Sequence, residues 1–173
     1  MQRCPEAHID AIDIDSYAAE QARENGVKAF VSSLQNWQGS YDLIVSNPPY
    51  FQNSLKNPDE GRKAARHTDT LSYAELIHHS ARLLTEHGQL ALILPAEAEN
   101  EIRQLAAVEN LFLTHVTRVY SKENKKPKRV LLAFEKLKIK NYELKISEDT
   151  LILEDEKGGR SAAYSELTKD FYL

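Results

Sequence analysis

The run YDLIVSNPPYF, residues 41–51, decides how the rest of the sequence is interpreted. Its first part holds Leu43, Ile44 and Val45 in one continuous apolar stretch, which is typical of a strand buried on both faces of a parallel sheet. The four residues that follow cannot continue the strand, because two adjacent prolines remove two backbone donors. The sequence therefore predicts a strand over residues 41–46 that ends in a stiff polar turn.

Strands and helices alternate on the amino-terminal side of this run. Residues 8–13 and 27–31 have strand-like patterns. Between them, Asp15-Ser16 is a good N-cap pair for a helix that Gly26 ends. A strand, a helix and a second strand therefore precede the 41–46 strand.

The carboxyl-terminal side continues the alternation after a polar stretch, residues 51–69. The pattern Ser72-x-x-Glu75 is a capping box that opens a helix to about residue 86, closed by His87-Gly88. The later elements expected are a strand (89–94), a helix (97–108), two β-rich segments (112–120 and 129–134), a hairpin (138–153) and a short final helix (161–169).

This order favours an open α/β sheet, mostly parallel, with right-handed crossovers. The two late β-rich segments, joined by a short loop, would add an antiparallel edge. We expect one domain over residues 1–173, with residues 138–173 appended to it as a hairpin and a short helix. Ligands of such sheets bind beyond the carboxyl ends of the strands. Asp13-Ile14-Asp15 and the Asn-Pro-Pro-Tyr turn both lie at that rim.

The turn Asn47-Pro48-Pro49-Tyr50 has the groups needed to activate a planar amine. The prolines stiffen the segment and so hold the Asn47 side-chain oxygen and the Pro48 carbonyl in place. Two acceptors that converge on one –NH₂ group favour a pyramidal nitrogen whose lone pair points at a methyl donor. The Tyr50 ring offers a stacking surface for a flat base. The simpler alternative is a rigid turn after a buried strand.

Bulk composition excludes several classes of protein. The 173 residues are 42% hydrophobic and 28% charged, ordinary values for a globular domain. No apolar run reaches the length that crosses a bilayer, and the first residues lack a secretory signal, so we expect a cytoplasmic protein without membrane contact. A net charge of −4 means that contact with nucleic acid requires a local basic patch.

The longer match NPPYF…SLKNPD…R…ARHTDTLSY, followed by KRVLLAFEK, resembles one family in particular. YDLIVSNPPYF is similar to motif IV of class I amino-methyltransferases, which have a Rossmann-like sheet and use S-adenosylmethionine. The longer match is similar to the bacterial valine-tRNA adenine-37 methyltransferases and extends from about residue 2 to residue 173. The resemblance implies methylation of the exocyclic N6 amine of adenine in tRNA.

The resemblance also implies cofactor-binding residues. An acid that ends the second strand of the family binds the ribose hydroxyls, and Asp13 occupies that place here, while Asp15 caps the helix. Ser33-Leu34 stand where many such enzymes place an acid and an apolar residue around the adenine ring. Ser33 departs from that pattern. Asn47 would also lie beside the cofactor.

One family feature has no counterpart in the sequence. The glycine-rich loop after the family's first strand precedes the ribose-binding acid, yet the strand that Asp13 ends begins only seven residues after Met1. We therefore expect that the first strand and this loop are missing through truncation at the amino terminus. Such a chain would be poorly stable and inactive.

Two basic segments are candidates for contact with tRNA. Residues 122–129 (KENKKPKR) hold five Lys or Arg in eight residues, a density suited to phosphates. A solvated hairpin loop is the alternative. The segment after the Asn-Pro-Pro-Tyr turn holds further candidates. For these, the alternative is a helix with ordinary surface charges. The candidates are Arg62, Lys63, Arg66, His67, Lys125, Lys126, Lys128 and Arg129.

Three functions remain open from the sequence. The first is a tRNA adenine methyltransferase. The second is a protein-glutamine methyltransferase, because the same Asn47 and Pro48 acceptors would hold a side-chain amide. The third is a non-catalytic RNA-binding fragment, because the cofactor loop is missing. We expect no metal site, because the histidines and Cys4 lack ligand spacing, and we expect a monomer.

Overall fold

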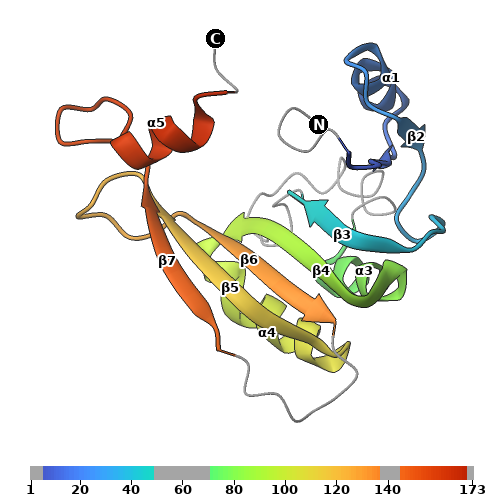
Figure 1. Cartoon of the computed structure of the whole chain (residues 1–173). Helices are drawn as coiled ribbons and strands as arrows, with labels where there is room; N and C mark the ends of the chain where they lie inside the picture. Colours follow the sequence, from blue (N-terminus) through green and yellow to red (C-terminus); the bar gives the residue numbers. More distant parts are fainter. Residues whose placement is uncertain (1–5, 49–70, 137–144, 171–173) are drawn as a thin grey trace, which may run out of the picture. The chain divides into compact units, whose positions relative to one another are not determined.

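The computed structural model describes residues 6–48, 71–136 and 145–170. The chain divides into two compact units, Met1–Gly39 and Ser40–Leu173. Each unit has a sheet of its own, with two strands in the first and five in the second (Figure 1). The single domain expected from the sequence therefore stays a prediction.

The first unit is a strand–helix–strand motif. β1 (Ala11–Asp13) and β2 (Ala29–Val31) pair in parallel, and α1 (Ser16–Glu24) connects them. Asp15 caps the helix as predicted, with its carboxylate accepting a hydrogen bond from the Tyr17 backbone N–H at 2.9 Å. The predicted order of these elements is confirmed, although both strands are shorter than expected.

The second unit holds a mixed sheet in the order β3-β4-β6-β5-β7. Its strands are β3 (Tyr41–Ser46), β4 (Leu84–Pro95), β5 (Leu111–Tyr120), β6 (Arg129–Lys136) and β7 (Ser147–Ile152). β3 is parallel to β4 and β5 is parallel to β7, while β6 is antiparallel to both of its neighbours. Because β6 alone runs the other way in this sheet, the carboxyl ends of β3, β4, β5 and β7 share one rim.

Among the described residues of the second unit, the helical elements are α3 (Tyr73–Leu83), the 3₁₀ turn η2 (Ala96–Ala98), α4 (Glu99–Val108) and α5 (Ala162–Thr168). The predicted capping box opens α3. Ser72 Oγ accepts from the Glu75 backbone N–H, and the Glu75 side chain accepts from the Ser72 backbone N–H at 2.9 Å. Figure 1 shows α4 behind β5 and β6.

The core of this unit lies between one face of the sheet and the helices α3 and α4. Alternate residues of β4 and β6 pair across the strands and are buried, as alternation along a strand requires. Ile77 of α3 and Ile102 of α4 complete the core, both fully buried. The buried pairs are Leu90 with Phe134, Leu92 with Leu132 and Leu94 with Val130.

Burial of β3 on both faces, expected from its apolar run, is wrong. Leu43 is 55% exposed and Val45 is 71% exposed. Ile44, which pairs with buried Leu90, is half-buried. The physical reason is that α3 and α4 cover the face of the sheet that carries Leu90, whereas Leu43 and Val45 point to the opposite face.

The boundary between α3 and β4 also differs from the prediction. The helix ends at Leu83 rather than near residue 86, and β4 begins at Leu84 rather than at Gln89. His87, at φ 65°, and Gly88 form an irregularity inside the strand instead of a loop before it. A Cβ on Gly88 would lie 3.0 Å from the Tyr41 carbonyl oxygen, so β3 would have to shift by a few tenths of an ångström to admit a side chain there.

The carboxyl-terminal strands pair over a long range. The predicted antiparallel pair, β5 and β6, forms, but it is not the edge of the sheet, because β7 adds to the free side of β5. β7 is the described part of the hairpin expected over residues 138–153. The first strand of that hairpin lies largely outside the described residues, and the expected final helix is α5.

Candidate active site

Asn47 and Pro48 lie at the carboxyl end of β3, as the sequence predicts. Asn47 is exposed and Pro48 is buried, so the polar side chain is presented while the ring that follows it is fixed in the protein. The pairing of Ser46 with Leu92 places Asn47 beside the carboxyl-terminal part of β4. This arrangement suits a rigid acceptor at the rim of the sheet.

The basic loop, residues 121–128, lies at the same rim. It joins the carboxyl end of β5 to the start of β6, where Arg129 pairs with Pro95 of β4. The Lys128 backbone N–H donates to the Val119 carbonyl at 3.0 Å, and its carbonyl accepts from the Ala96 N–H at 3.3 Å. These two hydrogen bonds anchor the carboxyl end of the loop to β5 and to the residue that follows β4. β4 is the strand that pairs with β3, which ends just before Asn47.

The side chains of Lys125, Lys126 and Lys128 are exposed, whereas Arg129 is half-buried. Within the part of the chain that the structure describes, these three lysines form no ion pair. Solvated ammonium groups of this kind are suited to phosphate contact. The structure thus brings three of the predicted RNA-binding residues to one loop, and Arg129 follows directly as the first residue of β6.

An ionic network fixes the start of α4 near this rim. The guanidinium of Arg118 in β5 lies 2.7 Å from Glu148 of β7 and 3.3 Å from Glu99 of α4. Hydrogen bonding to Glu148 is the main cause that raises the pKa of Arg118 above its ordinary value. Arg103 also contacts Glu99, at 3.2 Å. The network ties the helix after β4 to two strands.

The predicted cofactor residues of the first unit lie side by side. Asp13 ends β1 and is exposed, and its backbone carbonyl accepts from the Ser32 N–H at 2.9 Å. Ser33 and Leu34 follow directly and are half-buried. One Asp13 carboxylate oxygen accepts from the Asp15 N–H at 2.8 Å. A carboxylate and a short polar turn therefore meet at the ends of β1 and β2.

Several predicted site residues fall outside the described residues. Pro49 and Tyr50, the second half of the turn, are among them. Arg62, Lys63, Arg66 and His67 also lie there. Their expected stacking and phosphate contacts stay predictions.

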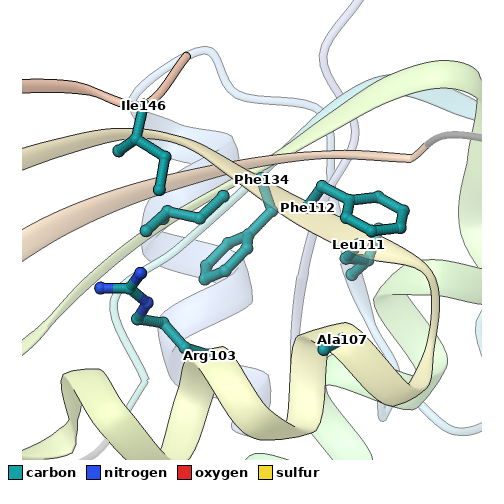
Figure 2. Close-up of a pocket in the computed structure, with 7 residues that line it drawn as sticks. Arg103, Ala107, Leu111, Phe112, Phe134 and Ile146 are labelled. Carbon is teal, nitrogen blue, oxygen red and sulfur yellow. The ribbon is translucent and has the colours of Figure 1, made fainter. Parts of the chain in front are cut away.

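An apolar hollow lies at the opposite end of the sheet, near the start of β5 (Figure 2). Arg103 and Ala107 of α4 line one side, and the Phe134 side chain points toward them. The other lining residues are Leu111, Phe112, Leu113 and Ile146. Because Arg103 is already paired with Glu99, the hollow lacks a convergent set of reactive groups.

Within residues 6–48, 71–136 and 145–170, no three His, Cys, Asp or Glu side chains gather as metal ligands. No helix in the same ranges has the length and apolar character needed to cross a membrane. Trp37 packs against Phe30 with ring centroids 4.9 Å apart.

One feature of the rim has no local signal in the sequence. Glu154, which follows β7, lies 3.5 Å from Lys122 in the basic loop. The two residues meet because β7 pairs with β5, and that pairing joins segments about thirty residues apart. Hydrophobic periodicity and motif spacing in the sequence therefore do not predict this ion pair.

Comparison with known proteins identifies the family. The family model of Eco57I restriction-modification methylases matches residues 4–123. The tRNA1(Val) (adenine(37)-N6)-methyltransferase of Parabacteroides distasonis is 40% identical over 179 residues, which cover 96% of this chain and 74% of the relative. The protein of the same name from Phocaeicola vulgatus is 39% identical over 182 residues, covering 99% of this chain and 75% of the relative.

Solved structures with low sequence identity share the fold. A predicted O-methyltransferase from Agrobacterium tumefaciens superposes with a TM-score of 0.70 at 13% identity, covering 95% of this chain and 78% of that one. A putative class I S-adenosylmethionine-dependent methyltransferase from Listeria monocytogenes gives 0.57 at 16% identity, covering 87% and 52%. The predicted Rossmann-like class I methyltransferase fold is thus confirmed. Together with the close relatives, these matches mean that the chain belongs to the tRNA1(Val) (adenine(37)-N6)-methyltransferase family.

Proposed function

We propose that this chain methylates the exocyclic N6 amine of an adenine in tRNA, with S-adenosylmethionine as the methyl donor. The observation that carries the proposal is the rim of the second unit, where exposed Asn47 and an exposed basic loop both lie at the carboxyl ends of the sheet strands. Relatives at 39–40% identity bear the name of this activity. Their names give the finer target, adenine 37 of valine tRNA.

Asn47 and Pro48 orient the amine. The Asn47 side-chain oxygen and the Pro48 carbonyl each accept one hydrogen of the –NH₂ group, which frees the nitrogen lone pair from conjugation with the ring. Burial of Pro48 keeps the turn rigid, so little reorganisation is needed when the base arrives. Tyr50, followed by Phe51, supplies the stacking surface, and Pro49 stiffens the turn.

The chemistry of the first unit fits the cofactor. S-adenosylmethionine, when bound, supplies an electrophilic methyl group. The Asp13 carboxylate is exposed at the end of β1 and suits two ribose hydroxyls, because a carboxylate accepts from both. Leu34 provides an apolar contact for the adenine ring, and Ser33 contributes through its backbone or hydroxyl. Asn47 would contact the cofactor as well as the substrate.

Basic residues hold the tRNA while the base leaves its stack. Lys125, Lys126 and Lys128 in the basic loop bind phosphates together with Arg129 at the start of β6. The segment with Arg62, Arg66 and His67 contributes further contacts. Extruding a base costs a few kcal/mol, and less for a base in a loop. An anticodon-loop adenine meets that condition.

We further propose a monomer that acts in the cytoplasm, where tRNA is modified. Residues 1–173 would act as one methyltransferase domain, with residues 138–173 appended. A single cooperative unfolding transition supports one domain, and two separate transitions contradict it. Sedimentation at micromolar concentration tests the monomer.

Nucleoside mass spectrometry of tRNA tests the function directly. Deleting the gene should abolish N6-methyladenosine from valine tRNA, and expressing this chain should restore it. Purified protein, labelled S-adenosylmethionine and unmodified tRNA should give labelled RNA. Label in protein instead of RNA contradicts the proposal and supports glutamine methylation. Absence of cofactor binding by calorimetry supports a non-catalytic RNA-binding fragment.

A further inference from the structure

The basic loop has an uneven distribution of charge. Its β5 end holds Lys122 followed by Glu123, whereas its β6 end holds Lys125, Lys126 and Lys128 with no acid between them. All five side chains are exposed. The β6 end is therefore the more positive half of the loop before any neighbouring segment is considered.

A turn after β7 adds acids to the β5 end alone. The ladder between β7 and β5 continues beyond the strands, because the Leu153 N–H donates to the Tyr120 carbonyl at 2.9 Å and the Glu154 N–H donates to the Ser121 carbonyl at 3.0 Å. Three consecutive acids, residues 154–156 (the acidic turn), begin there. The Glu154 carboxylate lies 3.5 Å from the Lys122 ammonium.

The acidic turn is held in place by its own hydrogen bonds. The Asp155 carboxylate accepts from the backbone N–H groups of Lys157 at 2.9 Å and Gly159 at 2.8 Å. The Ser161 N–H donates to the Leu153 carbonyl at 2.9 Å and so closes the turn. Gly158, at φ 83°, allows the reversal. The backbone of Glu154 therefore stays beside the basic loop.

The two cations that follow do not cancel this effect at Lys122. The Arg160 guanidinium lies 5.9 Å from the centre of the Tyr164 ring in α5, so it is directed toward that helix. Lys157 stands beyond the acids in sequence and is exposed. Glu154 remains the carboxylate that contacts the basic loop.

Strand order gives the charge difference a direction. β7 lies on the outer side of β5. On the other side of β5 lie β6, β4 and β3 in that order, and Asn47 directly follows β3. Figure 1 shows the loop after β5 and the turn after β7 at the same end of the sheet. The acids thus flank the side of the loop that faces away from Asn47, within a Debye length of any phosphate bound at Lys122.

We propose that Glu154 is a specificity-determining residue that neutralises Lys122 and confines RNA phosphates to Lys125, Lys126 and Lys128, on the Asn47 side of the rim. The inference rests on the proposed function, because it describes how the same loop holds tRNA. A lysine already paired with a carboxylate releases no condensed counterion when RNA binds, so it adds nothing to the salt dependence. RNA that runs outward over β7 meets repulsion.

Salt dependence of binding to an unmodified tRNA transcript tests the proposal. The proteins compared are the unmodified chain, Lys122→Gln, Glu154→Gln and the double variant, with Lys125→Gln as the matched control. Lys125→Gln should reduce the slope of log Kd against log salt by roughly 0.7–0.9. Lys122→Gln alone should leave the slope unchanged. Glu154→Gln should increase it by the same roughly 0.7–0.9 and tighten binding several-fold, and the double variant should lose that gain.

The outcomes separate this inference from the proposed function. If Lys122→Gln alone reduces the slope as much as Lys125→Gln does, or if Glu154→Gln has no effect, Glu154 does not neutralise Lys122 and the inference is wrong while RNA binding stands. If the unmodified chain binds tRNA without salt dependence, or if Lys125→Gln has no effect, the RNA-binding role of the loop fails and the inference fails with it.

Discussion

Lys136 closes the carboxyl end of α3 through Ala81. The ammonium group of Lys136, in β6, donates to the Ala81 carbonyl at 2.6 Å and also to the Leu84 carbonyl at 2.9 Å. Ala81 lies in the last turn of the helix, whose acceptors lack partners inside the helix, and Leu84 is its C-cap residue. A cation at that end also interacts favourably with the helix dipole.

Replacing Lys136 by Met should therefore destabilise the protein by about 1.5–3 kcal/mol, because two charge-assisted hydrogen bonds are lost. Chemical denaturation measures the free energy of unfolding. The matched control is Lys126→Met, an exposed side chain in the basic loop, which should change that free energy by less than about 0.5 kcal/mol. Equal effects of the two changes would contradict the capping role.

Asn47→Ala should slow methyl transfer by about 10²–10³-fold, which corresponds to about 2.7–4 kcal/mol of lost transition-state stabilisation. Cofactor affinity should fall by far less than the rate, because the Asp13 carboxylate still holds the cofactor. Single-turnover transfer to tRNA and calorimetry with S-adenosylmethionine measure the two effects. Asn100→Ala, on the exposed face of α4, is the matched control and should leave the rate unchanged. A rate within a few-fold of the unmodified chain would mean that Asn47 does not orient the amine.

Substitutions of Asp13 and Asp15 should affect different properties, namely cofactor binding for Asp13 and protein stability for Asp15. Asp13→Ala should weaken cofactor binding by at least tenfold, because the ribose hydroxyls lose a charged acceptor. Asp15→Ala should mainly lower stability, by about 1 kcal/mol, since the cap of α1 is lost. Calorimetry and thermal unfolding report on both variants. The assignment of Asp13 would not survive if Asp15→Ala weakened binding as strongly.

Neighbouring leucines of β6 provide a test of the core. Leu132 is 1% exposed and packs in the core, whereas Leu131 is 36% exposed on the opposite face. Leu132→Ala should cost about 2–5 kcal/mol, as for other buried leucines, and Leu131→Ala clearly less. Urea denaturation with a common m-value measures the difference. Similar costs would imply that the second face is packed as tightly as the first.

His79 should make stability depend on pH. Burial lowers the pKa of His79 below its ordinary value, helped by His78 and Arg82, and its Nδ1 atom is buried without a hydrogen-bond partner in the described structure. The unfolded chain then binds the proton more readily. The stability that neutral His79 contributes to the folded protein is complete above the unfolded pKa of about 6.5. It is lost as pH falls toward the folded pKa. His79→Gln should flatten the decline in melting temperature between pH 7 and 5, and an unchanged decline would contradict it.

Local signals in the sequence predicted the elements that depend on local interactions. The capping box at Ser72 and Glu75 and the cap at Asp15 appear in the structure because each needs only residues within one turn. The rim position of Asn47 followed from a strand that must end at proline. The predicted active-site roles of these rim residues stay proposals.

Features that depend on distant partners were not predicted. Gly88 looked like a helix stop, yet it belongs to β4, because the Tyr41 carbonyl of β3 approaches it closely. The exposure of Val45 depends on which face of the sheet the helices cover, and the apolar run in the sequence does not predict that face. The contact between Glu154 and Lys122 needs β7 beside β5. In each case tertiary pairing decides what the local pattern leaves open.

The reversed direction of β6 has a consequence for how this enzyme diversifies. Because β6 returns beside β5 without a crossover helix, the connection between them is a simple hairpin whose length no packed layer restricts. Doubling a flexible loop costs only about 0.6 kcal/mol. Insertions and deletions there would leave buried positions such as Leu132 undisturbed, so the length and charge of this loop can change during evolution at little thermodynamic penalty.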